Sequence, residues 1–593
     1  MFLRTKLLCR CEKHCYFPTT LRRLLTHLVP ISMAPFLDER KPNSERQLLF
    51  DRQLIKSRHF TMSQFVDFSF KVSKSDLSID FNVFAEELLV RSQELMTMKD
   101  IGKSLVLLKT AKLTSSKSNG ALKLVRVLVS KVQSCPDEDV SAGSISSILN
   151  SLQYLSSDRS EVLQLMASLV PKVQSCQEEF SSKYIAMALN GIRYMSSSHP
   201  EVLQLIAAII PKVQACPETF TAAGVAMALQ GLQNMRSNHP EILQLVAALV
   251  PLVQACPDRL TAQNVAMALY GLNHLSSDHS EVLQLIKALV PKVQSCSEIL
   301  SAQNVGMALY GLHHLSSDHQ DVLELVIVLV PKVRSCSDTF RAQNVAMALH
   351  GLRYMKSNQS CVAQLITALV PKVQSCSEKL TSQNVAMALY GLHNLSSNRL
   401  EVVQLIAALV PKVQSSLGKL DAQQVAMALY GLYDFSSDHP AVLQLVQALL
   451  QKVRSSSLGK MDAQQVAMAL YGLRQLSSDR PEVLQLIKAL VPKVQNCSDP
   501  FTAQGVGLAL NGLMRMKCNH PEVLQLIAAL VPIVQSCKQE LAYKFSFMAW
   551  QGVQNMSEDR PEVFQLLKAL VPKLQELDGT ALARVQPFLK RLP

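Results

Sequence analysis

The chain repeats one 40-residue segment, with little change, over most of its length. The stretch "TAQNVAMALYGLNHLSSDHSEVLQLIKALVPKVQSC", from Thr261 to Cys296, returns forty residues later as "SAQNVGMALYGLHHLSSDHQDVLELVIVLVPKVRSC". Aligned on the recurring Gly-Leu pair, repeats 1 to 11 occupy 141–180, 181–220, 221–260, 261–300, 301–340, 341–380, 381–420, 421–461, 462–501, 502–541 and 542–578. One residue is inserted near Ser457, and positions are counted from the first residue of each repeat. A fixed period of this length is typical of stacked helical arrays, and it argues against several unrelated globular domains.

The order of residue types within one repeat predicts two helices joined by a turn. In repeat 4, Thr261 is a good N-cap residue, and Val265, Leu269 and Leu272 recur at helical spacing as one apolar face. A second apolar face follows in "EVLQLIKALVPKVQSC", after the turn "SSDHSE". Aromatic side chains make up only 5% of a chain that is 48% hydrophobic, which favours helices rich in Ala, Leu and Gln. We therefore expect an all-α fold, an α-solenoid (superhelix) of stacked helix-turn-helix repeats of 40 residues.

Three features of the repeat carry more specific expectations. Asp278, with Glu281 three residues later, is expected to cap the second helix as a capping box. A proline at the place of Pro291 recurs in ten of the eleven repeats, and an interior proline is expected to kink or split the second helix. Gly311 is expected inside the first helix, on a face where neighbouring helices approach most closely.

The segments outside the repeats at 141–578 have a different composition. Residues 1–35 hold six Lys or Arg and a single acid, which is typical of an organelle transit peptide; a disordered leader and a misassigned start codon are equal alternatives. We expect 1–60 to be a basic, poorly ordered leader, 61–140 to hold divergent N-terminal capping repeats, and 579–593 to form a C-terminal cap or tail. The expected location is an intracellular, reducing compartment, and the leader favours a mitochondrion or plastid.

The net charge of +13 is unevenly distributed along the chain. Residues 1–140 contain 23 Lys or Arg and 15 Asp or Glu, whereas residues 141–593 contain 36 and 31. The repeats are therefore close to neutral, and their bulk charge does not indicate a polyanionic partner.

Nine of the fourteen cysteines occupy the same place in successive copies, as Cys256 and Cys296 do. None of the nine has another Cys at the short spacing that zinc sites use. We expect them to fill space at the end of the second helix, and we expect neither a metal nor a cofactor.

The sequence carries no recognisable catalytic motif. Phosphate-binding loops, zinc-protease helices, nucleophile elbows and kinase signatures are absent from the sequence. The histidine of the inter-helix turn, such as His279, alternates with Arg399 and Arg480, so imidazole chemistry is not required there. Catalysis needs one asymmetric constellation, whereas this chain offers the same residues in every copy. We expect a non-enzymatic, monomeric protein without a small-molecule substrate and, because no long uncharged apolar run occurs, without a membrane span.

Variation among the copies marks a candidate ligand-binding stripe. Positions 3, 10, 13 and 14 change among amide, aromatic, histidine and arginine side chains, and positions 3, 7, 10 and 14 would share one face of the first helix. The stripe comprises Gln263, Tyr270, Asn273, His274, Gln303, Tyr310, His313, His314, Gln343, His350, Arg353, Tyr354, Gln383, Tyr390, His393, Tyr430, Tyr433, Tyr471 and Arg474. Such side chains suit base recognition by helical-repeat RNA binders, and Tyr and Met also suit protein interfaces. The remaining alternative is a row of boundary positions that merely tolerate polar residues.

A second recurring series is basic and forms a candidate phosphate ladder. Its members at position 32 of successive repeats are Lys292, Lys332, Lys372, Lys412, Lys452 and Lys493. They could track the phosphates of a nucleic acid. Alternatively they complement the negative end of a helix dipole, and the near-neutral repeats favour this alternative.

The stretch "QNVAMALYGL" resembles the opening helix of octotricopeptide and heptatricopeptide repeats, which are helical pairs of organellar RNA-binding proteins in algae and apicomplexans. It is also similar to tandem repeats of some bacterial type III effectors and to related bacterial repeat families of unknown function. The resemblance covers 141–578. Residues such as Tyr270 mostly stand where octotricopeptide repeats have Trp, Trp550 lies one position away, "PPPEW" is absent, and no RAP domain is recognisable.

The resemblance implies RNA binding, and the basic leader sets it in an organelle. The leading expectation is a non-enzymatic scaffold that binds single-stranded RNA along the stripe, at about one base per repeat. The alternative is a protein–protein interaction scaffold, such as an assembly factor or bacterial-type effector, that binds no nucleic acid.

Overall fold

The computed structural model describes residues 96–110, 119–155, 157–455, 460–557 and 559–574, together with Val66 and Leu88. The expected leader and C-terminal tail lie outside these residues. The chain divides into two compact parts, Met1–Asp139 and Val140–Pro593. In the first part, the described helices are α5 (Met98–Thr110), α6 (Asn119–Ser134) and the short 3₁₀ helix η2 (Asp137–Asp139).

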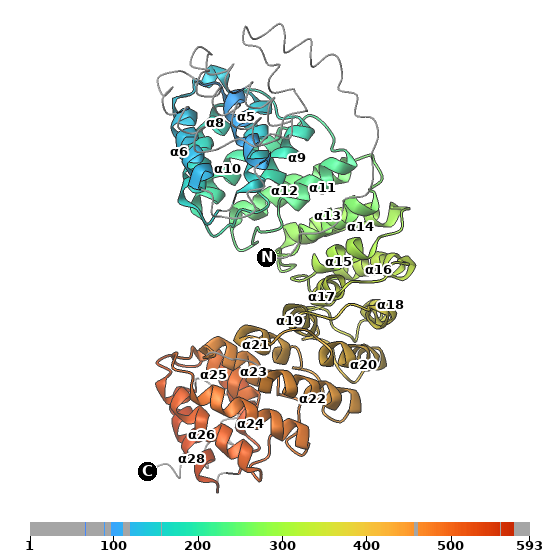
Figure 1. Cartoon of the computed structure of the whole chain (residues 1–593), viewed down its shortest axis with the longest axis vertical. Coiled ribbons are helices and arrows are strands. Elements are labelled where there is room, and N and C mark those ends of the chain that lie inside the picture. Colours follow the sequence, from blue (N-terminus) through green and yellow to red (C-terminus); the bar gives the residue numbers. More distant parts are fainter. Residues whose placement is uncertain are drawn as a thin grey trace, which may run out of the picture. The chain divides into compact units, whose positions relative to one another are not determined.

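The described residues of the second part form eleven helix pairs, as the sequence predicts (Figure 1). The first helices of repeats 1 to 11 are α7 (Ala142–Ser151), α9 (Ser182–Gly191), α11 (Ala222–Gln230), α13 (Ala262–Tyr270), α15 (Ala302–Tyr310), α17 (Ala342–His350), α19 (Ser382–Tyr390), α21 (Ala422–Tyr430), α23 (Ala463–Tyr471), α25 (Ala503–Asn511) and α27 (Tyr543–Val553). The second helices are α8 (Ser160–Ser175), α10 (Pro200–Gln214), α12 (Pro240–Ala255), α14 (Ser280–Ser295), α16 (Gln320–Ser335), α18 (Ser360–Ser375), α20 (Leu400–Gln414), α22 (Pro440–Ser455), α24 (Pro481–Gln495), α26 (Pro521–Ser536) and α28 (Pro561–Leu570). Two 3₁₀ helices, η3 (Leu152–Tyr154) and η4 (Val571–Lys573), follow α7 and α28.

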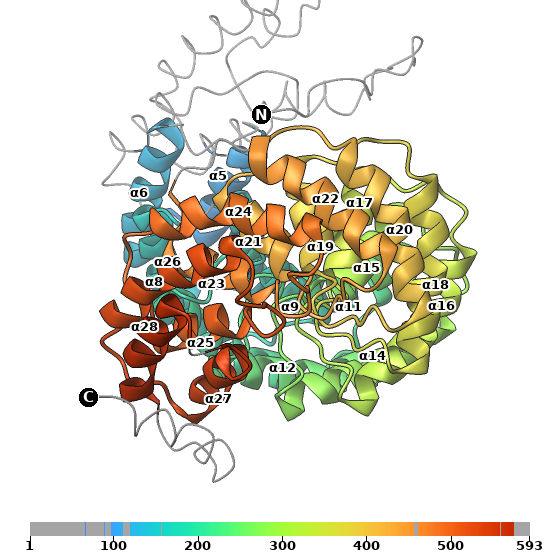
Figure 2. The ribbon, with the colours of Figure 1, turned by 90° about the horizontal axis from the view of Figure 1, so that it is seen from below.

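The helices form two layers, one of first helices and one of second helices. Each first helix packs against the first helices of its neighbours, as α13, α15 and α17 do, and each second helix packs in the same way against second helices. Figure 2 shows α15 inside the layer of α16 and α18. Packing between like helices of successive repeats is the architecture of an α-solenoid, so the expected fold class is confirmed. No described helix combines the length and the apolar character that a membrane span requires.

The first helix begins at the expected N-cap residue, and a carboxylate also accepts a hydrogen bond from the start of the helix. The hydroxyl of Thr261 accepts a hydrogen bond from the backbone N–H of Asn264 (3.1 Å), and the Asn264 side chain accepts one from the N–H of Thr261, which completes a capping box. The N–H of Ala262 donates to the carboxylate of Glu298 (2.7 Å). This acidic residue lies in the loop that leads to the next repeat, and equivalent carboxylates cap α7, α9, α11, α15 and α17.

The apolar faces predicted from sequence form the core. Val265, Leu269 and Leu272 of the first helix and its following turn are fully buried, and so are Leu285 and Ile286 of the second helix. Burial of one such side chain contributes about 1.5 to 3 kcal/mol, and the repeats multiply this contribution along the array.

The expected cap of the second helix is wrong, and so is one of the two effects expected of its proline. The residue before α14 is His279, which makes no side-chain cap, and the carboxylate of Asp278 accepts a hydrogen bond from Ser276 (2.8 Å). The helix is also not split at Pro291 but continues to Ser295. Pro291 is exposed on the surface of the helix, so water can bond the carbonyl that the missing N–H leaves unpaired.

Gly311 occupies the tightest contact between repeats. It follows the last residue of α15, outside the helix where the sequence placed it, and its φ of −61° is accessible to any residue. A Cβ on Gly311 would overlap the backbone carbonyl of Leu269 in the preceding repeat. Glycines at position 11 of repeats 2 to 11 all meet this carbonyl, whereas repeat 1 has Ser151 at this position. The expected close approach is therefore confirmed at this residue.

A buried serine joins the turns of successive repeats. The hydroxyl of Ser317 accepts a hydrogen bond from the backbone N–H of Lys356 (2.8 Å), and Ser277 accepts one from Ser316 (2.9 Å). The first of the two serines in "SSD" forms a local contact, and the second connects the repeats.

Substitution of Gly311 by Ala should destabilise the array by about 2 kcal/mol or more, because the added methyl group overlaps a backbone carbonyl that cannot move independently. Gly306→Ala, inside α15, is the matched control. Its Cβ would lie 3.3 Å from Asn344, and Ala stands at this position in repeats 4 and 6. Urea denaturation followed by circular dichroism measures both; equal stability of the two variants would contradict this account of the contact.

Candidate ligand-binding stripe

The tenth residues of repeats 4 to 9 form one continuous ladder of rings. Their ring centroids are separated by 5.5 Å, 5.2 Å, 5.7 Å, 5.5 Å and 5.6 Å from each repeat to the next. The ladder consists of Tyr270, Tyr310, His350, Tyr390, Tyr430 and Tyr471. These distances are in the range of stacked aromatic pairs. Interior rings of the ladder therefore have a neighbouring ring on both sides, and a base cannot insert between them.

Amide side chains replace the rings at both ends of the array. Asn190 donates to the side-chain oxygen of Asn150 (3.3 Å), and Asn511 donates to that of Gln551 (3.4 Å). The tenth position thus forms hydrogen-bonded amide pairs in repeats 1 and 2 and in repeats 10 and 11, whereas Gln230 of repeat 3 accepts a hydrogen bond from Arg193.

The first helix ends at position 10, so positions 13 and 14 lie in the turn that follows and not on the helix. The backbone there makes short-range bonds, such as His313 N–H to the Tyr310 carbonyl (3.1 Å). This turn carries the thirteenth side chain onto the tenth residue of the next repeat.

Residues at position 13 pack between the rings of the ladder. The ring of His313 lies 3.9 Å from that of His350, and the ring of His393 lies 4.1 Å from that of Tyr430. Their Nδ1 atoms are also within hydrogen-bond distance of the backbone carbonyls of His350 (3.3 Å) and Tyr430 (3.1 Å). Position 13 therefore contributes to packing between repeats.

Tyr433 and Arg353 also contact the tenth residue of the next repeat, whereas Arg474 and Asn273 differ. Tyr433 stacks on Tyr471 at 4.5 Å, and the guanidinium of Arg353 lies 4.3 Å from the ring centroid of Tyr390. Arg474 lies over the ring of Tyr433. Asn273 is buried, and its side-chain oxygen has no hydrogen-bond partner.

The fourteenth residues form a parallel row that is partly exposed. The ring of His314 lies 5.8 Å from that of His274 and 5.9 Å from that of Tyr354. The side chain of Asn394 instead bonds the backbone carbonyl of Arg353 (2.7 Å). The row therefore lies beside the ladder in repeats 4 to 6.

The glutamines at position 3 lie apart from the ladder. Gln263 lies at the start of α13 and Tyr270 at its end, about 10 Å apart along the helix axis. All four predicted glutamines are exposed, namely Gln263, Gln303, Gln343 and Gln383. The structure brings positions 10, 13 and 14 together and leaves position 3 on a separate part of the surface.

Tyrosine hydroxyls remain accessible on the edge of the ladder. Tyr270, Tyr310 and Tyr390 are half-buried, and their hydroxyls form no hydrogen bond with the described residues and are not enclosed. Three unbonded hydroxyls, in repeats 4, 5 and 7, are thus available to hydrogen-bond a ligand.

Burial keeps the histidines of the ladder neutral. Loss of solvent lowers the pKa of His313 to about 2 and that of His350 to about 3, and nearby histidines and Arg353 add to the effect. The same cause lowers the pKa of His314 and of His393 to about 4. It also raises the pKa of Tyr390 to about 12. At neutral pH the ladder therefore presents neutral donors and acceptors.

The lysines of the candidate phosphate ladder contact the protein itself. Lys292 Nζ donates to the backbone carbonyl of Cys256 at the end of the preceding second helix. The same bond to position 36 of the preceding repeat is made by Lys332, Lys372, Lys412 and Lys452. This geometry favours the alternative in which the lysine complements the negative end of a helix dipole. That helix belongs to the preceding repeat and not, as expected, to the repeat of the lysine. For Lys493, the equivalent position lies outside the described residues.

The recurring cysteines lie at this same junction. Cys256, Cys296, Cys336 and Cys376 are buried and not disulfide-bonded, and burial raises the pKa of the Cys376 thiol. In the described part of the chain, no group of His, Cys, Asp or Glu is arranged to hold a metal ion.

Cations at position 16 were not singled out by the sequence analysis. Most repeats have Ser there, but repeats 3, 6 and 10 have Arg236, Lys356 and Lys517. The ammonium of Lys356 pairs with Asp318 at 2.7 Å, and that of Lys517 pairs with Asp479 at 2.6 Å. The signal that could have found them is a charged residue at a position that is otherwise Ser.

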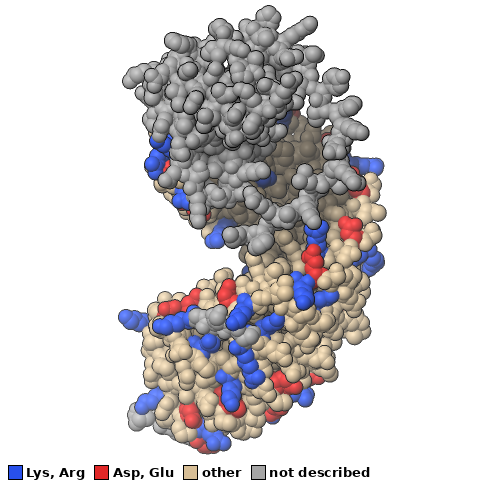
Figure 3. All heavy atoms as spheres, in the orientation of Figure 1, with Lys and Arg blue, Asp and Glu red and all other residues tan. Residues whose placement is uncertain are grey.

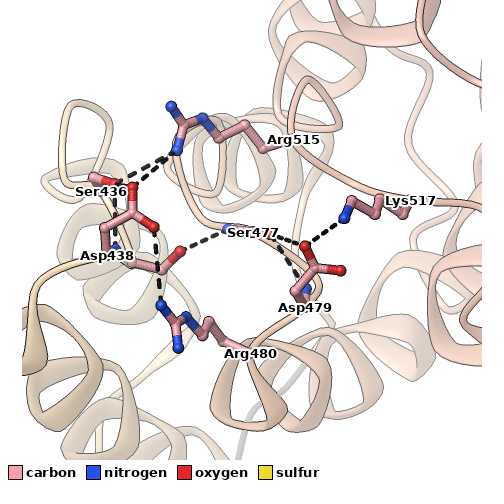
Figure 4. Close-up of polar contacts among 8 residues, drawn as sticks. Ser436, Asp438, Ser477, Asp479, Arg480, Arg515 and Lys517 are labelled. Carbon is pink, nitrogen blue, oxygen red and sulfur yellow. Dashed lines mark hydrogen bonds and ion pairs between the residues drawn. The ribbon is translucent and has the colours of Figure 1, made fainter.

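Acidic residues of the turns neutralise neighbouring cations in repeats 8 to 10. Figure 4 shows the carboxylate of Asp438 between Arg515 (3.5 Å) and Arg480 (4.0 Å), and the Asp479–Lys517 pair beside them. In Figure 3, blue and red side chains are interspersed over the part of the surface that is not grey.

Taken together, the repeats and the ladder define an α-solenoid whose variable side chains gather at the ends of its first helices. No protein-family model matches the chain, and no curated protein sequence does. Among structures, the chain is similar to a homology model of the full-length AP-3 complex in an intermediate open conformation, at 12% identity and a TM-score of 0.30, covering 96% of this chain and 99% of that one. It is also similar to yeast Rmd9p in complex with 16nt target RNA, at 12% identity and a TM-score of 0.29, covering 83% and 93%. Scores this low carry no argument about what this chain binds.

The buried histidines predict a loss of stability in mild acid. Their folded pKa values lie below the ordinary value of about 6.5, so below that pH the unfolded chain takes up protons that the folded chain does not. Each of His313, His350 and His393 should therefore lower the free energy of unfolding by about 1.4 kcal/mol per pH unit between pH 6.5 and its folded pKa.

Thermal denaturation between pH 7.5 and pH 5 measures this effect. The triple variant His313→Asn, His350→Tyr and His393→Asn, built from residues that other repeats carry at these positions, should show a flatter dependence of Tm on pH. His319→Gln in the turn, where repeat 6 has Gln359, serves as the control. An unchanged dependence in the triple variant would refute the assignment.

The lysine series predicts a change in stability without a change in salt response. Leu252 stands at this position in repeat 3, so Lys332→Leu, Lys372→Leu and Lys412→Leu is a matched set. Loss of each ammonium–carbonyl bond should cost about 1 kcal/mol and lower Tm. The slope of log K against log salt for RNA binding should equal that of the wild type. A clearly smaller slope would instead show that these lysines contact phosphates.

Proposed function

We propose that the array is a non-catalytic scaffold that binds single-stranded RNA along repeats 4 to 9. The observation that carries the proposal is the unbroken ladder from Tyr270 to Tyr471, which offers side chains at one residue per repeat and without a net charge of its own. Helical-repeat proteins that recognise single-stranded RNA use one repeat for each base. The basic segment 1–35 favours an organelle as the setting.

The geometry narrows how the bases would be recognised. Stacking of bases on aromatic faces is the usual sequence-tolerant mode, but neighbouring rings occupy the faces of the interior ladder. The free groups are the hydroxyl edges of Tyr270, Tyr310 and Tyr390. We therefore propose recognition by hydrogen bonds from these edges to base edges, at about one base per repeat.

A protein partner is the second candidate, and the charge of the repeats favours it. Residues 141–593 contain 36 Lys or Arg and 31 Asp or Glu, and tyrosine and methionine are enriched at protein interfaces. Binding to RNA should weaken steeply as salt rises, because phosphate contacts release counterions. Binding to a neutral protein surface should depend much less on salt.

Removal of three hydroxyls tests the proposal without disturbing the ladder. The variant Tyr270→Phe, Tyr310→Phe and Tyr390→Phe keeps the stacked rings, so its Tm should stay within a few degrees of the wild type. Its affinity for a fluorescent single-stranded RNA library of random sequence should fall about tenfold or more, since each lost hydrogen bond is worth about 0.5 to 1.5 kcal/mol.

The matched control is Tyr→Ala at the same three positions. Loss of the rings removes stacking worth about 0.5 to 1.5 kcal/mol per pair in addition to their buried area, so this variant should lose thermal stability. Fluorescence anisotropy at 50 mM salt measures binding. A wild-type protein that binds no single-stranded RNA under this condition rules the proposal out in favour of a protein partner.

A further inference from the structure

The two other cations at position 16 are paired with an acid of the preceding repeat, but Arg236 is not. Lys356 and Lys517 meet Asp318 and Asp479, which are the position-18 residues of repeats 5 and 9. Repeat 2 has Ser198 at that position. The exposed Arg236 therefore has no carboxylate where its two counterparts have one, and no described acid lies within ion-pair distance of it.

Arg353 is held by aromatic rings instead of by an acid. Its guanidinium lies 4.8 Å from the ring centroid of Tyr354 and 4.3 Å from that of Tyr390, and its other polar neighbour is the hydroxyl of Tyr430. The Nε atom is buried without a hydrogen-bond partner. Within the described residues, no carboxylate forms an ion pair with it. Rings on its faces orient the planar guanidinium and leave N–H donors in the plane, which suits a phosphate.

Both arginines lie near the same row of fourteenth residues. After burial, Arg353 and Arg236 are among the causes that lower the pKa of His314, and Arg236 also lowers that of His274. His274 and His314 are neutral at pH 7, so the positive charge that acts on them comes from the two guanidinium groups.

The arginines at position 13 of repeats 2 and 9 bond polar side chains, as Arg353 does with the Tyr430 hydroxyl. Arg193 bonds the side chains of Asn190 (3.3 Å) and Gln230 (3.5 Å), and Arg474 bonds the Tyr433 hydroxyl. In repeats 8 to 10, Asp438 and Asp479 neutralise the cations around them (Figure 4). Arg236 and Arg353 thus lack an acidic partner among the described residues, although repeats 3 to 6 together are close to neutral, with 11 Lys or Arg and 10 Asp or Glu.

We infer that Arg236 and Arg353 are the phosphate anchor of the array, each contacting one phosphate of a single-stranded RNA that runs along the row of His274, His314 and Tyr354. This inference rests on the proposed function and adds where the backbone of the strand is held. Ladder hydroxyls contact base edges, and the two arginines fix the register of the strand.

Substitutions taken from the chain itself test the anchor. Arg236→Ser introduces the residue that most repeats have at position 16, and Arg353→Gln introduces the residue of repeats 1 and 3 at position 13. Lys356→Ser is the matched control, because it removes a cation at position 16 that Asp318 already neutralises. Affinity for a fluorescent single-stranded RNA of random sequence is measured by anisotropy from 50 to 300 mM salt.

The double variant should bind about tenfold or more weakly at 50 mM salt, and its slope of log K against log salt should be smaller by about 1.4, since each phosphate contact contributes about 0.7 on a single strand. Lys356→Ser should keep the wild-type slope. A lower Tm of Arg353→Gln would mix a loss of folding with a loss of binding. The test of the anchor then rests on Arg236→Ser alone, whose slope of log K against log salt should be smaller by about 0.7.

The possible failures are distinguishable. A wild type that binds RNA, with variants that keep its slope or lose no more than Lys356→Ser, overturns the anchor and leaves the proposed function standing. A wild type that binds no RNA at 50 mM salt overturns both.

Discussion

The contact between a glycine and a backbone carbonyl sets the spacing of the first-helix layer. At position 11 of repeats 2 to 11, the glycine lies so close to the carbonyl of the preceding repeat that no side chain fits. Because both partners are backbone, the distance between successive first helices is fixed at the ends of those helices. The tenth side chain is adjacent to this contact, so its ring necessarily meets the ring of the next repeat.

That spacing decides what the ladder can do. Rings that already stack on one another are closed to intercalated bases, and histidines that pack between them are held neutral by burial. Stability and recognition therefore use different parts of the same residue. The faces of Tyr310 and Tyr390 join the repeats, while their hydroxyl edges are open to a ligand.

The charges of the repeat are mostly used within the array. A lysine bonds the end of the preceding second helix, a carboxylate caps a first helix, and a serine hydroxyl joins two turns. The near-neutral composition of the repeats therefore does not show which of their charges already bond within the array. At position 16, Arg236 follows a repeat that has Ser198 in place of an acid, and among the described residues it has no ion pair, whereas Lys356 and Lys517 each have one.

The sequence by itself determined the repeat, the two helices, the cap of the first helix and the buried faces, because these depend on local propensity and on a period that many copies confirm. It also located the variable positions and the close approach at Gly311. Tertiary structure decided that the first helix ends at Tyr310, that Pro291 does not split the second helix, and that Asp278 does not cap it. It also decided that the lysines bond a neighbouring helix and that position 13 packs on position 10 of the next repeat. The lysine bonds and the packing of position 13 depend on contacts between residues about 36 to 41 apart in the chain, and no pattern within one repeat specifies which groups meet across that distance.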